Sequence, residues 1–234
     1  STQYSLKANH VLGSDITYEC IGKDSFKVIV NVYRDCNGIN IFNIKLDVTT
    51  VSGSFDTSLS ASSSLSSPVN ITPTCSQSCN RCTSSSCSFP YGIEKYTLFY
   101  IVDLTSLDST ECEVIFSWDQ CCRPHPLGMG GNYYFDATLN RCKAPCNNSP
   151  QFENDPLAIV CTGQDVVYNP VVIDFDTKNS SNTSDSLHFD FGCARNGRSN
   201  LINYPSGYSC SAPCSFWGHP NQNLQHPRGL HIEK

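Results

Sequence analysis

The residues best suited to chemistry are cysteines, four of which are closely spaced as Cys75-x3-Cys79-x2-Cys82-x4-Cys87. Three or four thiolates within about a dozen residues can surround a zinc ion or an iron–sulfur cluster. Zinc sites favour two Cys-x2-Cys pairs, or one such pair with two histidines, and only one x2 spacing occurs in this run. We therefore expect disulfides that hold a serine-rich loop to the edge of a sheet.

The chain has 15 cysteines in 234 residues, which is too many for a reducing cytosol unless metals bind them. We expect an extracellular, disulfide-bonded protein whose export signal has been removed, since the first residue is Ser1. An odd count leaves one thiol free, paired between chains, or paired beyond Lys234, and we favour the last. The remaining disulfide candidates are Cys20, Cys36, Cys112, Cys121, Cys122, Cys142, Cys146, Cys161, Cys193, Cys210 and Cys214.

The adjacent pair Cys121-Cys122 has two interpretations. A vicinal disulfide closes a strained ring that opens easily, which suits redox exchange. Alternatively, each thiol forms a disulfide with a different distant cysteine, so that two strands are cross-linked at one point. We favour this structural role. Pairings cannot be derived from the sequence alone.

A second group of chemically suited residues is acidic. Calcium takes six to eight oxygen ligands in irregular loops, and Asp174, Asp176 and Asp185 could supply some of them. The alternative is a solvated acidic loop that binds no metal. Further contributors before Pro156 would be Glu153, Asn154 and Asp155.

Composition excludes several functions. The formal net charge is −6, so no basic field exists to hold a nucleic acid backbone. Apolar stretches end after about eight residues, well short of the roughly 20 needed to cross a bilayer. No Gly-x-Ser-x-Gly elbow surrounds any serine, and we expect no catalytic residues and no enzyme.

Aromatic side chains suited to stacking on sugars or proteins include Tyr91, Tyr133, Tyr134, Phe216 and Trp217, although strand and rim positions are commoner for such residues.

Strict alternation of apolar and polar residues predicts strands, and long helical periodicity does not occur. Four apolar sets define the clearest strands: residues 26, 28, 30 and 32; 42, 44, 46 and 48; 98, 100, 102 and 104; and 112, 114, 116 and 118. Further strands are expected at 16–19, 133–139, 166–168, 171–174 and 187–191. The fold class is therefore all-β, with sandwiches as the expected architecture.

Loop composition suggests how these strands are organised. Residues 54–67 are serine-rich and too polar to repay the entropy of ordering, so we expect a loop or an exposed edge. Asn147-Asn148-Ser149-Pro150 is typical of a linker. We expect one disulfide-rich β-sandwich at residues 1–148, with a Ser/Cys-rich insertion at 54–90. A second β domain would occupy 149–234 and be incomplete within this chain.

Several motifs resemble one family in the same order. They are residues 10–20 (HVLGSDITYEC) followed by 33–36 (YRDC), Trp118 with 121–123 (CCR), 148–152 (NSPQF) with Pro156 and Cys161, and 174–176 (DFD) with 185–189 (DSLHF). This arrangement resembles the N-terminal regions of large secreted surface proteins of gliding Bacteroidetes, which a distant C-terminal domain directs through the type IX secretion system. The last motif departs from the family pattern, because residues 177–184 replace a single glycine.

The resemblance implies two tandem immunoglobulin- or cadherin-like domains at the tip of an adhesin-like chain that continues past Lys234. Its implied partners are other surface proteins, a substratum or glycans, and its implied role is non-enzymatic adhesion or gliding. The resemblance also supports calcium at the acidic motif. It supports linkage of Cys20 with Cys36, which would flank a strand pair. The alternative function is a structural subunit of an extracellular filament, or an exterior component of the secretion or gliding machinery.

Overall fold

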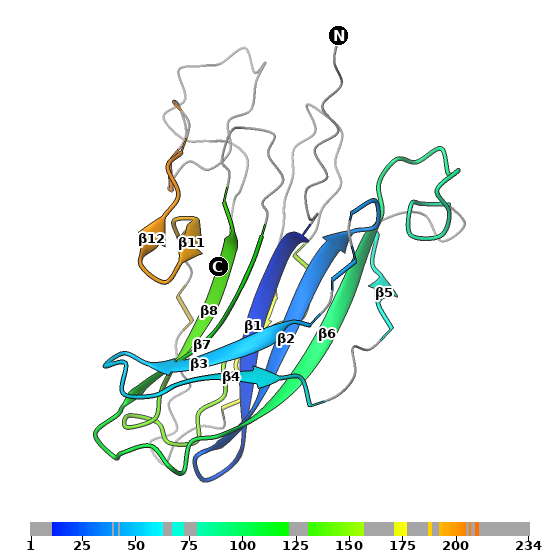
Figure 1. Ribbon diagram of the computed structural model, residues 1–234. Coiled ribbons are helices and arrows are strands. Elements are labelled where there is room, and N and C mark those ends of the chain that lie inside the picture. Colours follow the sequence, from blue (N-terminus) through cyan, green and yellow to red (C-terminus); the bar gives the residue numbers. More distant parts are fainter. Residues whose placement is uncertain are drawn as a thin grey trace.

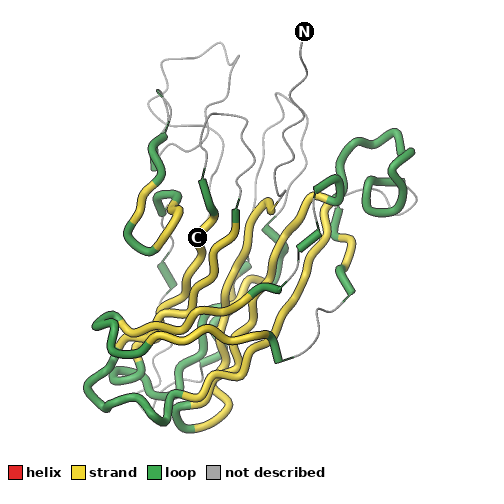
Figure 2. The backbone as a smooth tube through the Cα atoms, in the orientation of Figure 1, coloured by secondary structure: helices red, strands yellow, loops and turns green. Residues whose placement is uncertain are grey.

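The structure is a computed structural model that describes residues 11–38, 40–41, 43–62, 67–72, 79–121, 131–156, 171–176, 187–188, 192–204, 206 and 209–210. Within these ranges all regular structure is β, in antiparallel sheets, as expected from the alternation (Figures 1 and 2). No helix in the described part of the chain is long and apolar enough to span a membrane.

Eight strands form two four-stranded sheets. The first sheet has the order β1-β2-β6-β5, and the second has the order β4-β3-β7-β8. Lettered A to G, with β4 as an added strand C′, these sheets are ABED and C′CFG, the strand arrangement of immunoglobulin-type sandwiches. The strands are β1 (Val11–Gly22), β2 (Ser25–Asp35), β3 (Lys45–Thr50), β4 (Asp56–Ser60), β5 (Val69–Asn70), β6 (Ile93–Asp103), β7 (Glu113–Gln120) and β8 (Tyr133–Asn140).

The core is built from the alternating residues of both sheets. In the first sheet, Phe26 lies opposite Val102 and Val28 opposite Tyr100, and all four side chains are buried. Side chains at successive positions of a strand point to opposite faces, so the whole apolar set faces inward. The predicted inward sets are confirmed at Val30, Val32, Ile44, Leu46, Val48, Leu98, Leu104, Val114, Phe116 and Trp118.

Two polar contacts connect the two layers of the sandwich, one of them through Ile44, the residue before β3. The Trp118 indole Nε1 donates to Ser14 Oγ at 2.9 Å, and the Tyr100 hydroxyl donates to the Ile44 carbonyl at 2.8 Å. Burial raises the pKa of Tyr100, so its hydroxyl stays a donor. These bonds satisfy polar groups that would otherwise be costly to bury.

Some expected strand positions differ. Cys112 lies one residue before β7, is half-buried, and forms a disulfide with Cys142. Leu187 and His188 are in no strand, while residues 42, 166–168 and 189–191 lie outside the described residues. The range 54–90, expected as an insertion, contains β4 and β5, which are outer strands of the two sheets. In β4, exposed Asp56, Ser58 and Ser60 alternate with half-buried Thr57 and Leu59, so the exposed-edge interpretation is confirmed at 56–60.

The expected linker lies against the sandwich. Ser149 exchanges backbone and side-chain hydrogen bonds with Tyr18 of β1, and the Cys20 amide donates to Asn148 Oδ1 at 2.9 Å. Beyond it, β9 (Gln151–Phe152) pairs with β10 (Val172–Ile173). A hairpin of β11 (Arg195–Gly197) and β12 (Asn200–Leu201) contacts β8. The domain boundary near residue 148 stays a prediction.

Candidate functional site

The two ends of the sandwich differ, and the end where β2 finishes carries a protruding loop (Figure 1). We call the loop end the residues 35–38 after β2 together with residues 79–92 before β6. Asp35 of β2 lies opposite Ile93 of β6, so the two segments leave the sheet side by side. The Cys36 amide donates to the Gly92 carbonyl at 2.9 Å, and the Arg81 amide donates to the Tyr91 carbonyl at 3.1 Å.

Two disulfides hold this loop. Cys36 is bonded to Cys82, which anchors the loop to the end of β2, and Cys79 is bonded to Cys87 within the loop. Three of the four closely spaced cysteines are therefore oxidised, which confirms the disulfide interpretation for them and removes them as thiolate ligands. Cys75 lies outside the described residues.

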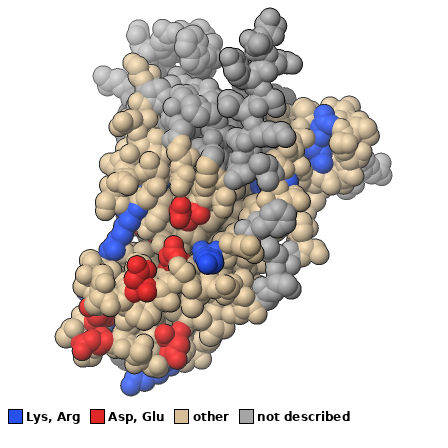
Figure 3. All heavy atoms as spheres, viewed as in Figure 1, with Lys and Arg blue, Asp and Glu red and all other residues tan. Residues whose placement is uncertain are grey.

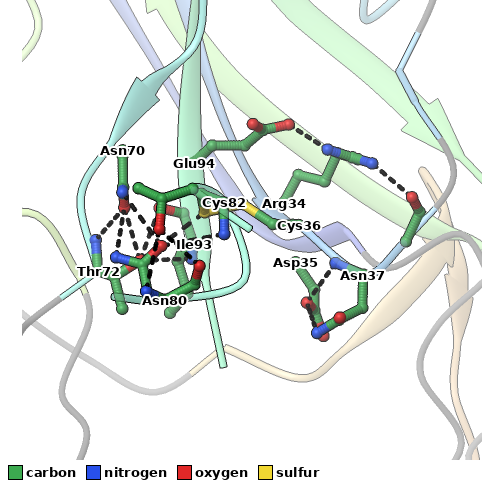
Figure 4. Close-up of a disulfide and its surroundings, with 12 residues drawn as sticks. Arg34, Asp35, Cys36, Asn37, Asn70, Thr72, Asn80, Cys82, Ile93 and Glu94 are labelled. Carbon is green, nitrogen blue, oxygen red and sulfur yellow. Dashed lines mark hydrogen bonds and ion pairs between the residues drawn. A yellow bond between two sulfur atoms is a disulfide. The ribbon is translucent and has the colours of Figure 1, made fainter. Parts of the chain in front are cut away.

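Next to the disulfide is a buried ion pair (Figure 4). Arg34 contacts the Glu94 carboxylate and the Gly38 carbonyl, and it is 5% exposed. The Tyr96 hydroxyl donates to Glu94 at 2.7 Å. Burial, followed by the neighbouring Glu94, raises the pKa of Tyr96 to about 12, so the phenol remains protonated. Arg34 thereby links residues 35–38 of the loop end to the start of β6.

The other side of the disulfide is fixed by side-chain amides (Figure 4). Buried Asn80 accepts from Asn70 Nδ2 at 3.2 Å and from the Cys82 amide at 3.0 Å. Thr72 Oγ1 donates to Asn70 Oδ1 at 2.7 Å and accepts from the Ile93 amide at 2.8 Å. These bonds tie the loop to β5 and to the first residue of β6.

Cys36, Cys82 and Glu94 could be mistaken for a metal centre, because their ligand atoms lie within 4.8 Å of one another. The two sulfur atoms are joined in a disulfide. The carboxylate already interacts with Arg34 and Tyr96. The group is therefore a structural anchor rather than a cation site.

The outer side of the loop end carries an aromatic pair. Tyr91 is 56% exposed, and its ring lies edge-on to Phe89 at a centroid distance of 5.5 Å. Next to it, Asn37 Nδ2 donates to the Pro90 carbonyl at 3.2 Å and to Asp35 Oδ1 at 3.0 Å. An exposed ring that follows a segment bonded to a carboxylate–amide pair can bind a partly apolar, partly hydroxylated surface.

The opposite end of the sandwich is tightly closed. We call the closed end the β1–β2 turn with residues 104–112 and 141–146. Disulfides Cys20–Cys146 and Cys112–Cys142 join its segments. Arg141 forms an ion pair with Asp24 in the turn at 2.8 Å. Asp24 has a φ of 55°, a left-handed conformation that aspartate tolerates better than most residues.

The expected Cys20–Cys36 pair is wrong. Cys20 lies opposite Phe26 at the closed end, whereas Cys36 follows β2 at the loop end. Ten residues of extended strand separate these positions by roughly 30 Å. Cys20 instead bonds Cys146, and Cys36 bonds Cys82.

The remaining cysteines are only partly described. Cys193 bonds Cys210, and Cys121 is disulfide-bonded. Its neighbour Cys122 lies outside the described residues, as do Cys161 and Cys214.

The acidic motif is also only partly described. Asp176 accepts from the backbone amide of Asn148 at 3.0 Å, and its own amide donates to Asp174 Oδ1 at 3.0 Å. Among the described residues, no further His, Cys, Asp or Glu joins these two in a three-ligand group, and Asp185 lies outside them. Asp155 forms an ion pair with Lys95 at 2.8 Å. Calcium binding at Asp174, Asp176 and Asp185 stays a prediction.

Sequence reasoning singled out Tyr91 as an aromatic but did not connect it with residues 35–37, more than 50 positions away. The only signal was the Cys36–Cys82 pairing, which spacing does not reveal.

Compared with known proteins, the chain matches no family model, no curated protein and no solved structure.

Proposed function

We propose that the chain is a non-enzymatic extracellular module that makes surface contacts through its loop end, as the N-terminal part of a large adhesin-like protein. The observation that carries this proposal is the difference between the two ends. Both ends have two disulfides and an ion pair, but at the closed end these join short connections, such as the turn between Gly22 of β1 and Ser25 of β2. The loop end projects a long, separately cross-linked loop with an exposed ring.

Rigidity supports a contact role. A loop held in one conformation loses little entropy on binding, so more of its interaction energy appears as affinity. In immunoglobulin variable domains, the loops of one end of the sandwich form the binding surface, including the loop between strands B and C. Residues 36–44 are the corresponding connection here, since β2 and β3 are strands B and C.

The disulfides also support an oxidising environment. Five bonds between described cysteines, and a sixth involving Cys121, suit a secreted or surface protein rather than a cytosolic one. Export through the type IX system and a role in gliding belong to this proposal through the motif resemblance alone.

Calcium at Asp174, Asp176 and Asp185 is a further part of the proposal. Asp176 already holds Asn148, whose side chain binds β1, so an ion there would stiffen the junction with the sandwich. Thermal unfolding with calcium and with a chelator tests it. A rise in Tm with calcium that Asp174→Asn abolishes supports the site, and an unchanged Tm contradicts it.

The alternative function, a filament subunit joined through sheet edges, has less support. Of the four outer strands, β5 has two residues and β4 has five, with Asp56, Ser58 and Ser60 exposed. The longer two are covered in part, since Asn148 and Ser149 hydrogen-bond to β1 and β11 contacts β8. Short, polar outer strands are a common means of preventing edge-to-edge pairing. Sedimentation of the chain without reductant would favour this alternative only if ordered multimers form.

Adhesion can be measured directly. Particles coated with the 234-residue chain are allowed to settle on bacterial or substratum surfaces, and the shear force that detaches them is recorded. We expect Tyr91→Ala at the loop end to lower that force and Val51→Ala to leave it unchanged. Val51 is a matched control because it is similarly exposed, at 52%, in the turn between β3 and β4. Equal forces for both variants would overturn the proposal.

A further inference from the structure

We propose that the loop end binds neutral saccharides, with the Tyr91 ring as a stacking platform and with Asp35 and Asn37 as hydrogen-bonding partners. This inference rests on the proposed function, because it assigns a ligand class to the same contact surface. A pyranose has an apolar C–H face and a rim of hydroxyls, so it needs a flat ring and adjacent polar groups together.

The ring is held in place before any ligand arrives. The Tyr91 carbonyl accepts from the Arg81 amide, and the next carbonyl, that of Gly92, accepts from the Cys36 amide. Phe89 packs edge-on to the ring at 5.5 Å and an interplanar angle of 72°. Tyrosine has few rotatable bonds, and packing on one side further limits its motion while 56% of the residue stays accessible.

Suitable polar groups lie against the residue before Tyr91. Asn37 is exposed and hydrogen-bonds to the carbonyl of Pro90, the residue that precedes Tyr91. Asp35 accepts from both the backbone and the side chain of Asn37. Both Nδ2 hydrogens of Asn37 are used in these bonds, so its Oδ1 and the Asp35 carboxylate are the groups that can accept hydrogen bonds from sugar hydroxyls. Cys36–Cys82 fixes these groups relative to Tyr91.

The chemistry of the loop favours a neutral sugar over other ligands. Residues 79–92 contain five serines and threonines and one charged residue, Arg81. On the face in Figure 3, the projecting loop is mostly uncharged, and the carboxylates lie lower, over the second sheet. One cation gives little attraction for a polyanion. Protein hot spots are usually buried clusters of large residues, whereas this site exposes one ring among hydroxyls.

Binding is tested with the intact chain and defined oligosaccharides. Calorimetry with cellohexaose, laminarihexaose, xylohexaose and mannohexaose should show binding to at least one of them. We expect Tyr91→Ala to weaken that binding at least about tenfold, Tyr91→Phe to retain most of it, and Asn37→Ala to weaken it severalfold. Val51→Ala should bind like the unaltered chain. Near-ultraviolet circular dichroism confirms that each variant remains folded.

Two results would overturn the inference: no probe binds, or Tyr91→Ala binds as well as the unaltered chain. Shear assays on treated surfaces separate this failure from failure of the proposed function. Periodate destroys sugar diols, and protease removes proteins. If adhesion depends on Tyr91, survives periodate and is lost after protease treatment, the loop end is a contact surface, but its ligand is a protein and not a saccharide. Adhesion independent of Tyr91 would reject the proposed function itself.

Discussion

Gly92 lies against Cys82 so closely that a Cβ added at residue 92 would come within 2.7 Å of the Cys82 amide nitrogen and 2.9 Å of its Sγ. The contact brings the last turn of the loop onto the Cys36–Cys82 disulfide, directly before β6 begins. Since the nearest obstructing atom belongs to the backbone, a methyl group would fit only if the loop moved.

Gly92→Ala should therefore destabilise the protein. Forcing a methyl group into a packed site typically costs about 1–3 kcal/mol, and urea unfolding measures that loss. Gly13→Ala is the control, because a Cβ at residue 13 meets no atom within 4 Å. Equal unfolding midpoints for the two variants would show that the loop adjusts freely, and would contradict the fixed geometry at Tyr91.

Removal of the Cys20–Cys146 disulfide should cost more stability than removal of Cys79–Cys87. The first joins residues 126 positions apart and the second residues 8 positions apart. The chain-entropy relation gives about 4–5 and about 2.5 kcal/mol, respectively. Paired Cys→Ser variants, unfolded in urea without reductant, provide the measurement. A larger loss from the short disulfide would mean that native contacts, rather than chain entropy, set the order.

The Arg141–Asp24 ion pair should stabilise the closed end more than a surface pair does. Its side chains are 10% and 17% exposed, compared with 34% and 36% for Lys27–Glu19. Solvent screens the more exposed pair, which should contribute about 0–1 kcal/mol, whereas separating a buried pair costs more. Double-mutant cycles with Arg141→Met and Asp24→Asn, and with Lys27→Met and Glu19→Gln, measure the two coupling energies. Similar values would contradict the expected difference.

The strands that form the core could be predicted because alternation directly reports which side chains face inward. Phe26, Val28, Val30 and Val32 are all buried, as their spacing requires. For β4 the sequence left a loop and an exposed edge open, and β5 was not predicted, because both strands bury few apolar groups and are defined by backbone pairing with β3 and β6.

Long-range partners could not be predicted. Arg34 and Glu94 are 60 positions apart, and no periodic pattern connects them. The error over Cys20 has a related cause. The sequence motif marked Cys20 and Cys36 as the ends of a strand pair, but not that they would lie at opposite ends of that pair. Disulfide pairing depends on which strand ends meet, and the sandwich topology determines this.

Asp15 makes stability depend on pH. It accepts from the Tyr33 hydroxyl at 2.7 Å and from Asn31 Nδ2 at 2.8 Å, and the charges of Lys95 and Asp155 also act on it. Desolvation by burial dominates and raises the pKa of Asp15 above its ordinary value. From about pH 4 up to the raised pKa, the folded protein binds more protons than the unfolded chain. The contribution of Asp15 to stability therefore falls as pH rises through this window.

Asp15→Asn removes this contribution, so the variant should gain stability relative to the unaltered protein as pH rises from about 4 to 7. Urea unfolding at pH 3.5, 5 and 7 follows the difference. Asp103→Asn is a control of opposite sign, because the Thr105 amide lowers the pKa of Asp103 in the folded state. With its pKa lowered, the ionised Asp103 stabilises the fold above about pH 4, and this stabilisation is lost as pH falls. Asp103→Asn lacks it, so the variant should lose stability relative to the unaltered protein as pH rises. Parallel pH profiles for the two variants would contradict the assignment, since burial and hydrogen bonding shift these carboxyl groups in opposite directions.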